Sequence, residues 1–414
     1  MSIRANNWSV VRFSDVVDIN PRPELDELGG DALVSFVPMK CVEEESGRFR
    51  SLGDRKIKEV RKGYTPFKDG DVLFAKVTPC MENGKAAVVT GLTNGIGFGS
   101  TELFALRPKA KLLQKFLFFF INQESFRRSA AANMTGAVGL RRVPKNYLAQ
   151  QPIPLPPIPD QRRIVAEIEK QFTRLDVGVA ALRRVQANLK RYRAAVLNAA
   201  CEGRLVPTDA IWPQKPITSA ILSMDQGWSP KCESEPSDSD TKWAVIKTTA
   251  IQNLRYIDAE NKALPLGLKP RVHLELMSGD LLVTRAGPRS RVGIACLVKI
   301  TRPRLMLCDK AYRLRCKPMV ASAAFLEVVL NAPRIVDAVN KLKTGISDSG
   351  VNLTQKGFGQ LLIPLPPLVE QTRIVAEVER RLSVVEELET LVQTNLQRAS
   401  RLRQSILQQA FTGS

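Results

Sequence analysis

The chain has 414 residues, which is too long for one ordinary core and predicts roughly two to four folded units. Hydrophobic residues make up 44% and charged residues 25%, a composition that excludes a largely disordered chain. Lysine and arginine total 61 against 41 acidic residues, and the net charge of +20 attracts polyanions, of which nucleic acid is the commonest partner. A basic protein without such a partner is the alternative.

Cysteine and histidine usage argues against a metal site. The seven cysteines form no CxxC pair, and His273 is the only histidine, whereas zinc requires clustered ligands at short spacing. Their number and irregular spacing in a long chain favour reduced thiols over a disulfide framework. The N-terminal residues lack the apolar stretch of a signal peptide, and the run from Phe116 to Ile121 is far shorter than the ~20 residues of a membrane span. We expect a cytoplasmic protein that contacts no membrane, with 116–121 in a core helix.

In chain order, two segments show β-rich runs followed by one apolar helix. The first has runs at 33–37, 71–77, 86–90 and 103–106 and a helix near 111–132. The second has runs at 243–246, 280–284 and 294–298 and a helix near 321–343. Both segments are predicted to be mixed α and β.

Each of these segments precedes a long helix. The first helix is predicted from about Asp160 to Ala200, because it follows a proline cluster, lacks interior proline and can be capped by Asp160. Apolar residues recur at every seventh position in both helices, and such a seam requires a partner helix. Gly178, Gln186 and Asn395 should weaken the pairing locally. The expected helix–helix interface consists of Ile168, Leu175, Leu182, Leu189 and Val196 with Val378, Val385, Val392 and Ile406.

An internal repeat covers the whole chain. The run IPLPP at 153–157 recurs at 363–367, and over 153–169 twelve of seventeen positions are identical to those 210 residues later. Upstream, Gly70-Asp71 corresponds to Gly279-Asp280 at an offset of 209. We predict an α+β protein in which two long helices form an antiparallel intramolecular coiled coil with a pseudo-two-fold axis. The predicted domains are 1–152 and 205–362, with proline turns and spacer helices at 153–204 and 363–414.

No catalytic centre is predicted. The sequence lacks GxxxxGK[ST] and the Asn-Pro-Pro-Tyr type of motif, and Gly95-Ile-Gly97-Phe-Gly99 fits a turn beside a strand better than a dinucleotide fingerprint. Cys80 and Cys201 have no histidine near them in sequence, and a lone histidine is more often structural.

Four features of the sequence resemble the specificity subunit of type I restriction–modification systems, and together they span essentially the whole chain. They are the twin IPLPP(x)3Q(x)RIVAE(x)E segments with their helices, the segment beginning at Trp8, the Gly-Asp pairs, and Gly227-Trp-Ser-Pro-Lys-Cys232. The resemblance implies that each globular part is a target-recognition domain reading one half of a split, asymmetric double-stranded DNA sequence. It also implies that the helices form a ruler that docks two methyltransferase subunits, and that restriction subunits join the complex. S-adenosylmethionine, ATP and Mg would belong to those partners, and this chain would hold no cofactor.

Base reading requires donors on loops, such as arginine or lysine for guanine and asparagine or glutamine for adenine. The candidates in the first domain are Lys76, Thr78, Asn83, Lys85, Arg141, Arg142 and Lys145. Those in the second are Arg285, Arg289, Ser290, Arg291, Asn352, Gln355 and Lys356. For any one of them, a solvated surface side chain is about as good an interpretation. Two rival functions are a structural adaptor whose ends bind proteins and an enzyme, either a nuclease or a fused methyltransferase.

Overall fold

A computed structural model describes residues 8–24, 28–137, 139–208, 211–345 and 347–412. The chain forms two compact units. Unit 1 comprises Met1–Leu182 with Thr394–Ser414, and unit 2 comprises Arg183–Gln393. Each unit therefore contains one sheet-rich part and a portion of each long helix. The expected α+β class with two long helices is confirmed.

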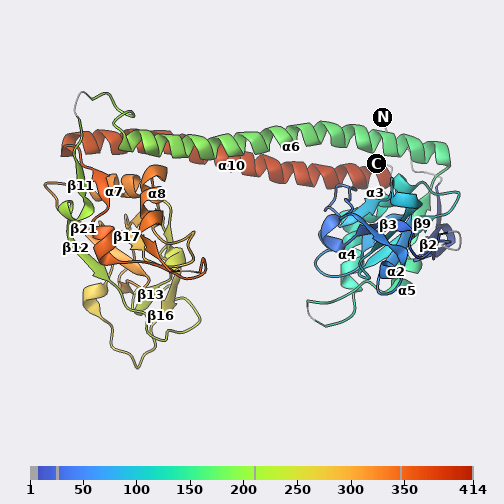
Figure 1. Ribbon diagram of the computed structural model, residues 1–414, viewed down its shortest axis with the longest axis horizontal. Helices are drawn as coiled ribbons and strands as arrows, with labels where there is room; N and C mark the ends of the chain where they lie inside the picture. The colour runs from blue at the N-terminus through green and yellow to red at the C-terminus, as the bar shows by residue number, and fades with distance from the viewer. Residues whose placement is uncertain (1–7, 25–27, 138, 209–210, 346, 413–414) are drawn as a thin grey trace. The chain divides into compact units, whose positions relative to one another are not determined.

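Unit 1 is built on two four-stranded sheets (Figure 1). The first has the order β2 (Val17–Ile19), β9 (Leu103–Pro108), β6 (Val72–Ala75) and β7 (Ala86–Val88). The second has the order β4 (Asp54–Lys56), β3 (Leu33–Val37), β8 (Ile96–Gly99) and β5 (Thr65–Lys68), with β3 and β8 parallel. Further elements include β1 (Ser9–Arg12), which pairs with β10 (Pro152–Leu155), and the helices α3 (Gln114–Ile121), α4 (Glu124–Ala132) and α5 (Lys145–Ala149).

Unit 2 repeats this plan. Its four-stranded sheet has the order β12 (Ile221–Gln226), β21 (Ala311–Cys316), β17 (Leu281–Thr284) and β19 (Ala295–Leu297). A second sheet has the order β16 (Asn261–Ala263), β13 (Ala244–Ile246) and β20 (Leu305–Met306), with β13 and β20 parallel. Further elements include β11 (Gln214–Pro216), which pairs with β24 (Leu362–Pro364), and the helices α7 (Ala323–Leu330), α8 (Pro333–Leu342) and α9 (Gln355–Gly359). The strands expected from sequence are present within one or two residues.

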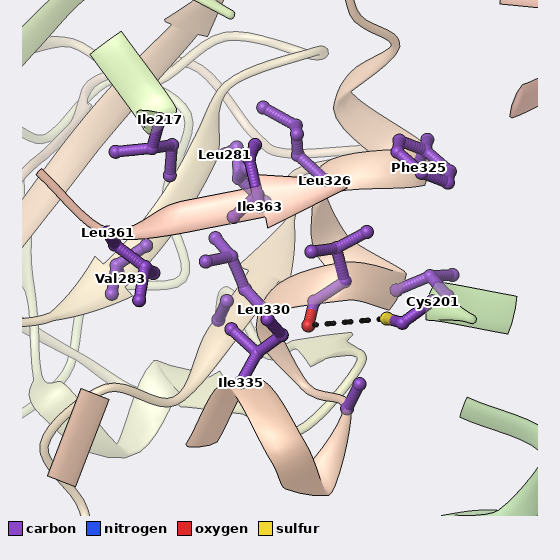
Figure 2. Close-up of a cluster of buried hydrophobic side chains, with 14 of the residues drawn as sticks. Cys201, Ile217, Leu281, Val283, Phe325, Leu326, Leu330, Ile335, Leu361 and Ile363 are labelled. Carbon is purple, nitrogen blue, oxygen red and sulfur yellow. Dashed lines mark hydrogen bonds between the residues drawn. The ribbon is translucent and has the colours of Figure 1, made fainter. Parts of the chain in front are cut away.

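The core of unit 2 lies between β17 and the helix α7. Figure 2 shows Leu281 and Val283 of β17 in one cluster with Phe325 and Leu330, all at most 1% exposed. Cys201, at the end of the first long helix, joins this cluster, and its thiol lies 4.0 Å from the carbonyl oxygen of Val329. Packing of this kind stabilises a unit through the apolar area removed from water.

The single apolar helices expected near 111–132 and 321–343 are each two helices, so that expectation was wrong. The first breaks at Asn122 and Gln123, between α3 and α4. The backbone of Gln123 is extended, which ends α3, and the buried Asn122 side chain donates to the carbonyl oxygen of Phe118 beside the backbone NH of Asn122. The second breaks before Pro333, which cannot continue α7 but suits the first turn of α8.

The long helices α6 (Ile158–Cys201) and α10 (Leu368–Thr412) are each unbroken (Figure 1). Because α6 begins at Ile158, Asp160 lies in its first turn and is not the cap predicted from sequence. The carboxylate still interacts favourably there with the positive end of the helix dipole.

The heptad residues of α6 and α10 face inward. Leu175 and Leu182 are half-buried, whereas the remaining seven predicted interface residues are buried. In unit 1 Arg403 pairs with Asp176 at 2.8 Å, and in unit 2 Arg193 pairs with Glu389 at 3.3 Å. The α10 partner number falls as the α6 number rises, which is the order of an antiparallel pair.

The repeated Gly-Asp motif begins the central strand of each main sheet. Gly70 and Gly279 both have a φ of +93°, a conformation that favours glycine. Asp71 is fully buried, and Arg107 donates to its two oxygens at 2.8 and 3.0 Å. In unit 2 the Nε of Arg315 donates to one oxygen of Asp280 at 3.1 Å. The motif therefore fixes a buried ion pair between neighbouring strands in both units.

The glutamine of the IPLPP(x)3Q motif joins three chain segments. The side chain of Gln161 is buried, accepts from the backbone NH of Leu113 at 2.8 Å, and donates to the carbonyl oxygens of Lys111 and Pro156. Gln371 makes the equivalent three bonds to Ser322, Val320 and Pro366 in unit 2. The motif is thus a buried connection between the proline turn, the long helix and the core helix.

Candidate nucleic-acid interface

In unit 1, two segments far apart in sequence form a small platform, which we define as residues 76–78, 135 and 141–143. The NH of Thr78 donates to the carbonyl of Arg141 at 3.0 Å, and the NH of Val143 donates to the carbonyl of Lys76 at 2.8 Å. Arg142 also bridges Val77 and Thr135. This brings the predicted residues Lys76, Thr78, Arg141 and Arg142 together.

Unit 2 contains the equivalent platform, residues 285–287, 343–344 and 351–353. Here β23 (Val351–Leu353) lies between β18 (Ala286–Gly287) and β22 (Lys343–Thr344). The NH of Leu353 donates to the carbonyl of Arg285 at 2.7 Å. Arg285 and Asn352 therefore occupy the places that Lys76 and Arg142 occupy in unit 1.

The other predicted residues flank the platforms. Asn83 and Lys85 lie in the turn after the first segment of unit 1, and Arg289, Ser290 and Arg291 lie in the corresponding turn of unit 2. Lys145 is the first residue of α5, and Gln355 and Lys356 are the first two of α9. All fourteen predicted residues thus lie on a platform, in the turn that follows it, or at the start of the next short helix.

Several of these side chains are held by acidic neighbours. Arg142 forms a two-pronged ion pair with Glu102, and the side-chain hydrogen bond lowers the pKa of Glu102 and raises the pKa of Arg142. Arg289 pairs with Asp348 at 2.8 Å, and Asn83 donates to Glu44 at 3.1 Å. Such exposed pairs stabilise the fold only slightly and can exchange partners when an anion arrives.

Other predicted side chains turn into the protein. Arg291 is half-buried, and its Nη2 donates to the carbonyl oxygens of Thr248 and Ile251 at 2.8 and 2.9 Å. Arg285 donates to the carbonyl oxygen of Asp309 at 2.9 Å. Gln355 donates to the carbonyl oxygen of a residue in β12. These contacts stiffen the loops that carry the remaining candidates.

The side chains of Lys145, Ser290, Asn352 and Lys356 are exposed and, within the described part of the chain, make no hydrogen bond or ion pair. They are the candidates most accessible to a duplex. Lys76 and Lys85 are half-buried, and the ammonium of Lys76 lies 5.2 Å from the ring centre of Phe104. Arg141 is 3.8 Å from Glu82.

Two residues of this region were missed from sequence. Glu102 and Lys310 occupy equivalent places, since their carbonyl oxygens accept the NH groups of Lys76 and Arg285 at 2.9 and 2.8 Å. The signal was available in the repeat, which aligns the two positions once a one-residue difference in offset is allowed. The charge is opposite in the two units, so the copies share a backbone but present different chemistry.

Among the described residues, no group of three or more His, Cys, Asp and Glu side chains could hold a metal ion. Burial raises the pKa of Cys201 and of Cys308 to about 12, which makes both poor nucleophiles at neutral pH. No helix in the described ranges is both long and apolar enough to span a bilayer.

Comparison with known proteins identifies the family. A sequence model described as the type I restriction modification DNA specificity domain matches residues 5–177. The specificity subunit of the type I restriction enzyme EcoEI from Escherichia coli is 31% identical over 477 residues, covering 94% of this chain and 80% of the relative. The EcoAI specificity subunit, also from E. coli, is 24% identical with the same coverage. The chain belongs to the family of type I restriction enzyme specificity subunits.

Solved structures support the fold. A chain from a study of complex assembly and conformational transition of the type I R-M system has a TM-score of 0.78 at 20% identity, covering 98% of both chains. The HsdS subunit from Thermoanaerobacter tengcongensis has a TM-score of 0.56 at 20% identity, covering 99% of this chain and 97% of that one.

Proposed function

We propose that this chain reads a split DNA target for a type I restriction–modification complex, with one half-site recognised by each unit. The observation that carries the proposal is the duplicated platform. The same backbone arrangement carries Lys76 and Arg142 in unit 1, whereas in unit 2 it carries the exposed Asn352 and Arg285, whose guanidinium bonds to Asp309. Side chains of these types form bidentate contacts with guanine or adenine in the major groove.

Because the side chains on the two platforms differ, the two half-sites differ in sequence. The paired helices α6 and α10 act as the ruler between them. An α-helix rises 1.5 Å per residue, so the 44 residues of α6 correspond to about 66 Å. Successive turns of the major groove recur every ~34 Å, and this leaves room for unread base pairs between the half-sites.

Two methyltransferase subunits dock on the helical pair, and restriction subunits join them. Exposed apolar side chains on α10 support this docking, since Val384 and Leu388 are 50% and 40% exposed, four residues apart on one helix face. S-adenosylmethionine, ATP and Mg bind to the partner subunits. This chain contributes recognition without catalysis, and the complex works in the cytoplasm.

The test is duplex binding by the assembled complex over a range of salt concentrations. We expect specific binding with a slope of log K against log salt near −0.9 per neutralised phosphate. Binding that is absent or independent of salt would favour the protein-binding adaptor. Methylation by the purified chain without a partner would favour the enzyme.

A further inference from the structure

Unit 2 contains a cavity of about 430 Å³ that the proposed reading function does not use. Four lysines line it: Lys231, Lys247, Lys262 and Lys310. Val245 and Ile246 of β13 provide an apolar wall. The size is within the range of sites for small ligands or parts of larger ones.

The cavity is strongly positive. Lys247 lies 3.7 Å from Glu260, but Lys231, Lys262 and Lys310 form no ion pair with a carboxylate in the described part of the chain. The one acidic residue in the lining is Asp309, and its carboxylate accepts the hydroxyl of Ser229 at 2.5 Å. Uncompensated cations around one cavity raise the local concentration of anions.

Two of the four lysines are not required by the fold, because the equivalent positions of unit 1 hold other residues. Lys310 corresponds to Glu102, as the backbone bonds to Arg285 and Lys76 show. Lys262 pairs with Val245 of β13 in unit 2. The counterpart of Val245 in unit 1 is Phe36 of β3, and the residue opposite Phe36 is Gly53. A feature confined to one copy of a repeated structure points to a role in that copy alone.

The cavity is joined directly to the platform of unit 2. The carbonyl of Lys310 accepts the NH of Arg285 at 2.8 Å, and the carbonyl of Asp309 accepts its guanidinium at 2.9 Å. An anion held by Lys310 would therefore lie beside the first segment of the platform. Contacts with DNA phosphates commonly fix the register of a protein on a duplex in this way.

We infer that this cavity binds a backbone phosphate of the target duplex and so positions unit 2 over its half-site. The inference rests on the proposed reading function. The ligand is a phosphodiester, bound by lysine ammonium groups as a point charge and without information about the base. The lysines hold the duplex, and the platform side chains read it.

The test compares two double variants in the assembled complex. Lys262→Gln with Lys310→Gln removes two cavity charges, whereas Lys242→Gln with Lys269→Gln removes two exposed charges that do not line the cavity. For the cavity variant we expect weaker binding to every duplex, with discrimination between matched and mismatched half-sites unchanged. Its salt slope should be flatter than that of the control variant by about 0.9 for each phosphate that it no longer neutralises.

An equal effect of the two variants, or a selective loss of discrimination, would overturn the inference. A second arm titrates inorganic phosphate and adenosine monophosphate into the complex without DNA. If either binds at the cavity while Lys310→Glu leaves duplex binding intact, the ligand is a small anion and the phosphodiester assignment is wrong. If the unsubstituted complex fails to bind any duplex specifically, the proposed function fails instead, so the two failures are distinguishable.

Discussion

Arg142 and Glu102 form a two-pronged ion pair on unit 1, with the arginine Nε and Nη2 at 2.8 and 2.7 Å from the carboxylate oxygens. The equivalent residues of unit 2 are Asn352 and Lys310, which form no such pair. Glu102 therefore occupies the donors of the Arg142 guanidinium that the proposed function assigns to DNA. Recognition through Arg142 requires that DNA replace this carboxylate.

The substitution Glu102→Gln should strengthen the binding of duplexes in general, because it removes a negative charge and releases Arg142. If the freed guanidinium meets a phosphate, the salt slope should steepen by about 0.9. Titration of labelled duplex at several salt concentrations measures both quantities. Glu124→Gln, which removes the partner of exposed Arg128, is the matched control. Unchanged or weaker binding by Glu102→Gln would show that Arg142 does not approach the duplex.

Replacing Gln161 by leucine should destabilise unit 1. The leucine leaves the NH of Leu113 and the carbonyl oxygens of Lys111 and Pro156 without their partner. Each of these groups that stays buried without a hydrogen bond should lower the free energy of unfolding by about 1–3 kcal/mol. Urea unfolding followed by circular dichroism measures the loss. Gln171→Leu on the same helix should change stability by about 0.5 kcal/mol or less, because among the residues that the structure describes this side chain bonds only to Glu167. If the two substitutions lowered stability equally, the glutamine of the IPLPP(x)3Q motif would not have the structural role that we assign to it.

Substitution of the buried Asp71 by asparagine should cost about 3 kcal/mol, because the charge of Arg107 then remains without its partner. Arg107→Met in the same chain should restore part of the loss, since a buried ion pair can often be replaced by apolar residues. A double-mutant cycle from unfolding midpoints gives the coupling between the two side chains. A coupling near zero would contradict the ion pair.

Gly178→Ala should stabilise the helix α6 by about 1 kcal/mol, the usual difference between these residues inside a helix. The glycine is exposed, and an added Cβ would meet no atom within 4 Å. The thermal midpoint of the chain measures the gain. A lower midpoint would mean that the glycine allows a contact that the alanine blocks.

Much of the fold could be predicted from sequence because the repeat aligns two independent copies. Short β-rich runs located β3, β6, β9 and β17, and the proline-free heptad segments located the helices α6 and α10. The breaks at Asn122 and before Pro333 were missed, because the apolar pattern continues through both. An extended residue between two helices, such as Gln123, is not visible in hydrophobic periodicity.

The candidate site was only partly predictable. Sequence located the loops, since the donors flank equivalent strand ends, but it could not show which donors are already engaged. Arg291 and Asn352 were equally good candidates from sequence. In the structure Arg291 donates to carbonyl oxygens about 40 residues away in the chain, whereas Asn352 is exposed. Side-chain partners of this kind depend on which segments the fold brings together, and no spacing rule reveals them.

The most direct test of the account is a genome-wide map of methylated adenines in cells with and without this chain. We predict that one motif, with two unlike half-sites and a fixed gap, disappears when the chain is absent. Asn352→Ala should alter only one half of that motif. Retention of every methylated motif without the chain would contradict the claim that its two units choose the target.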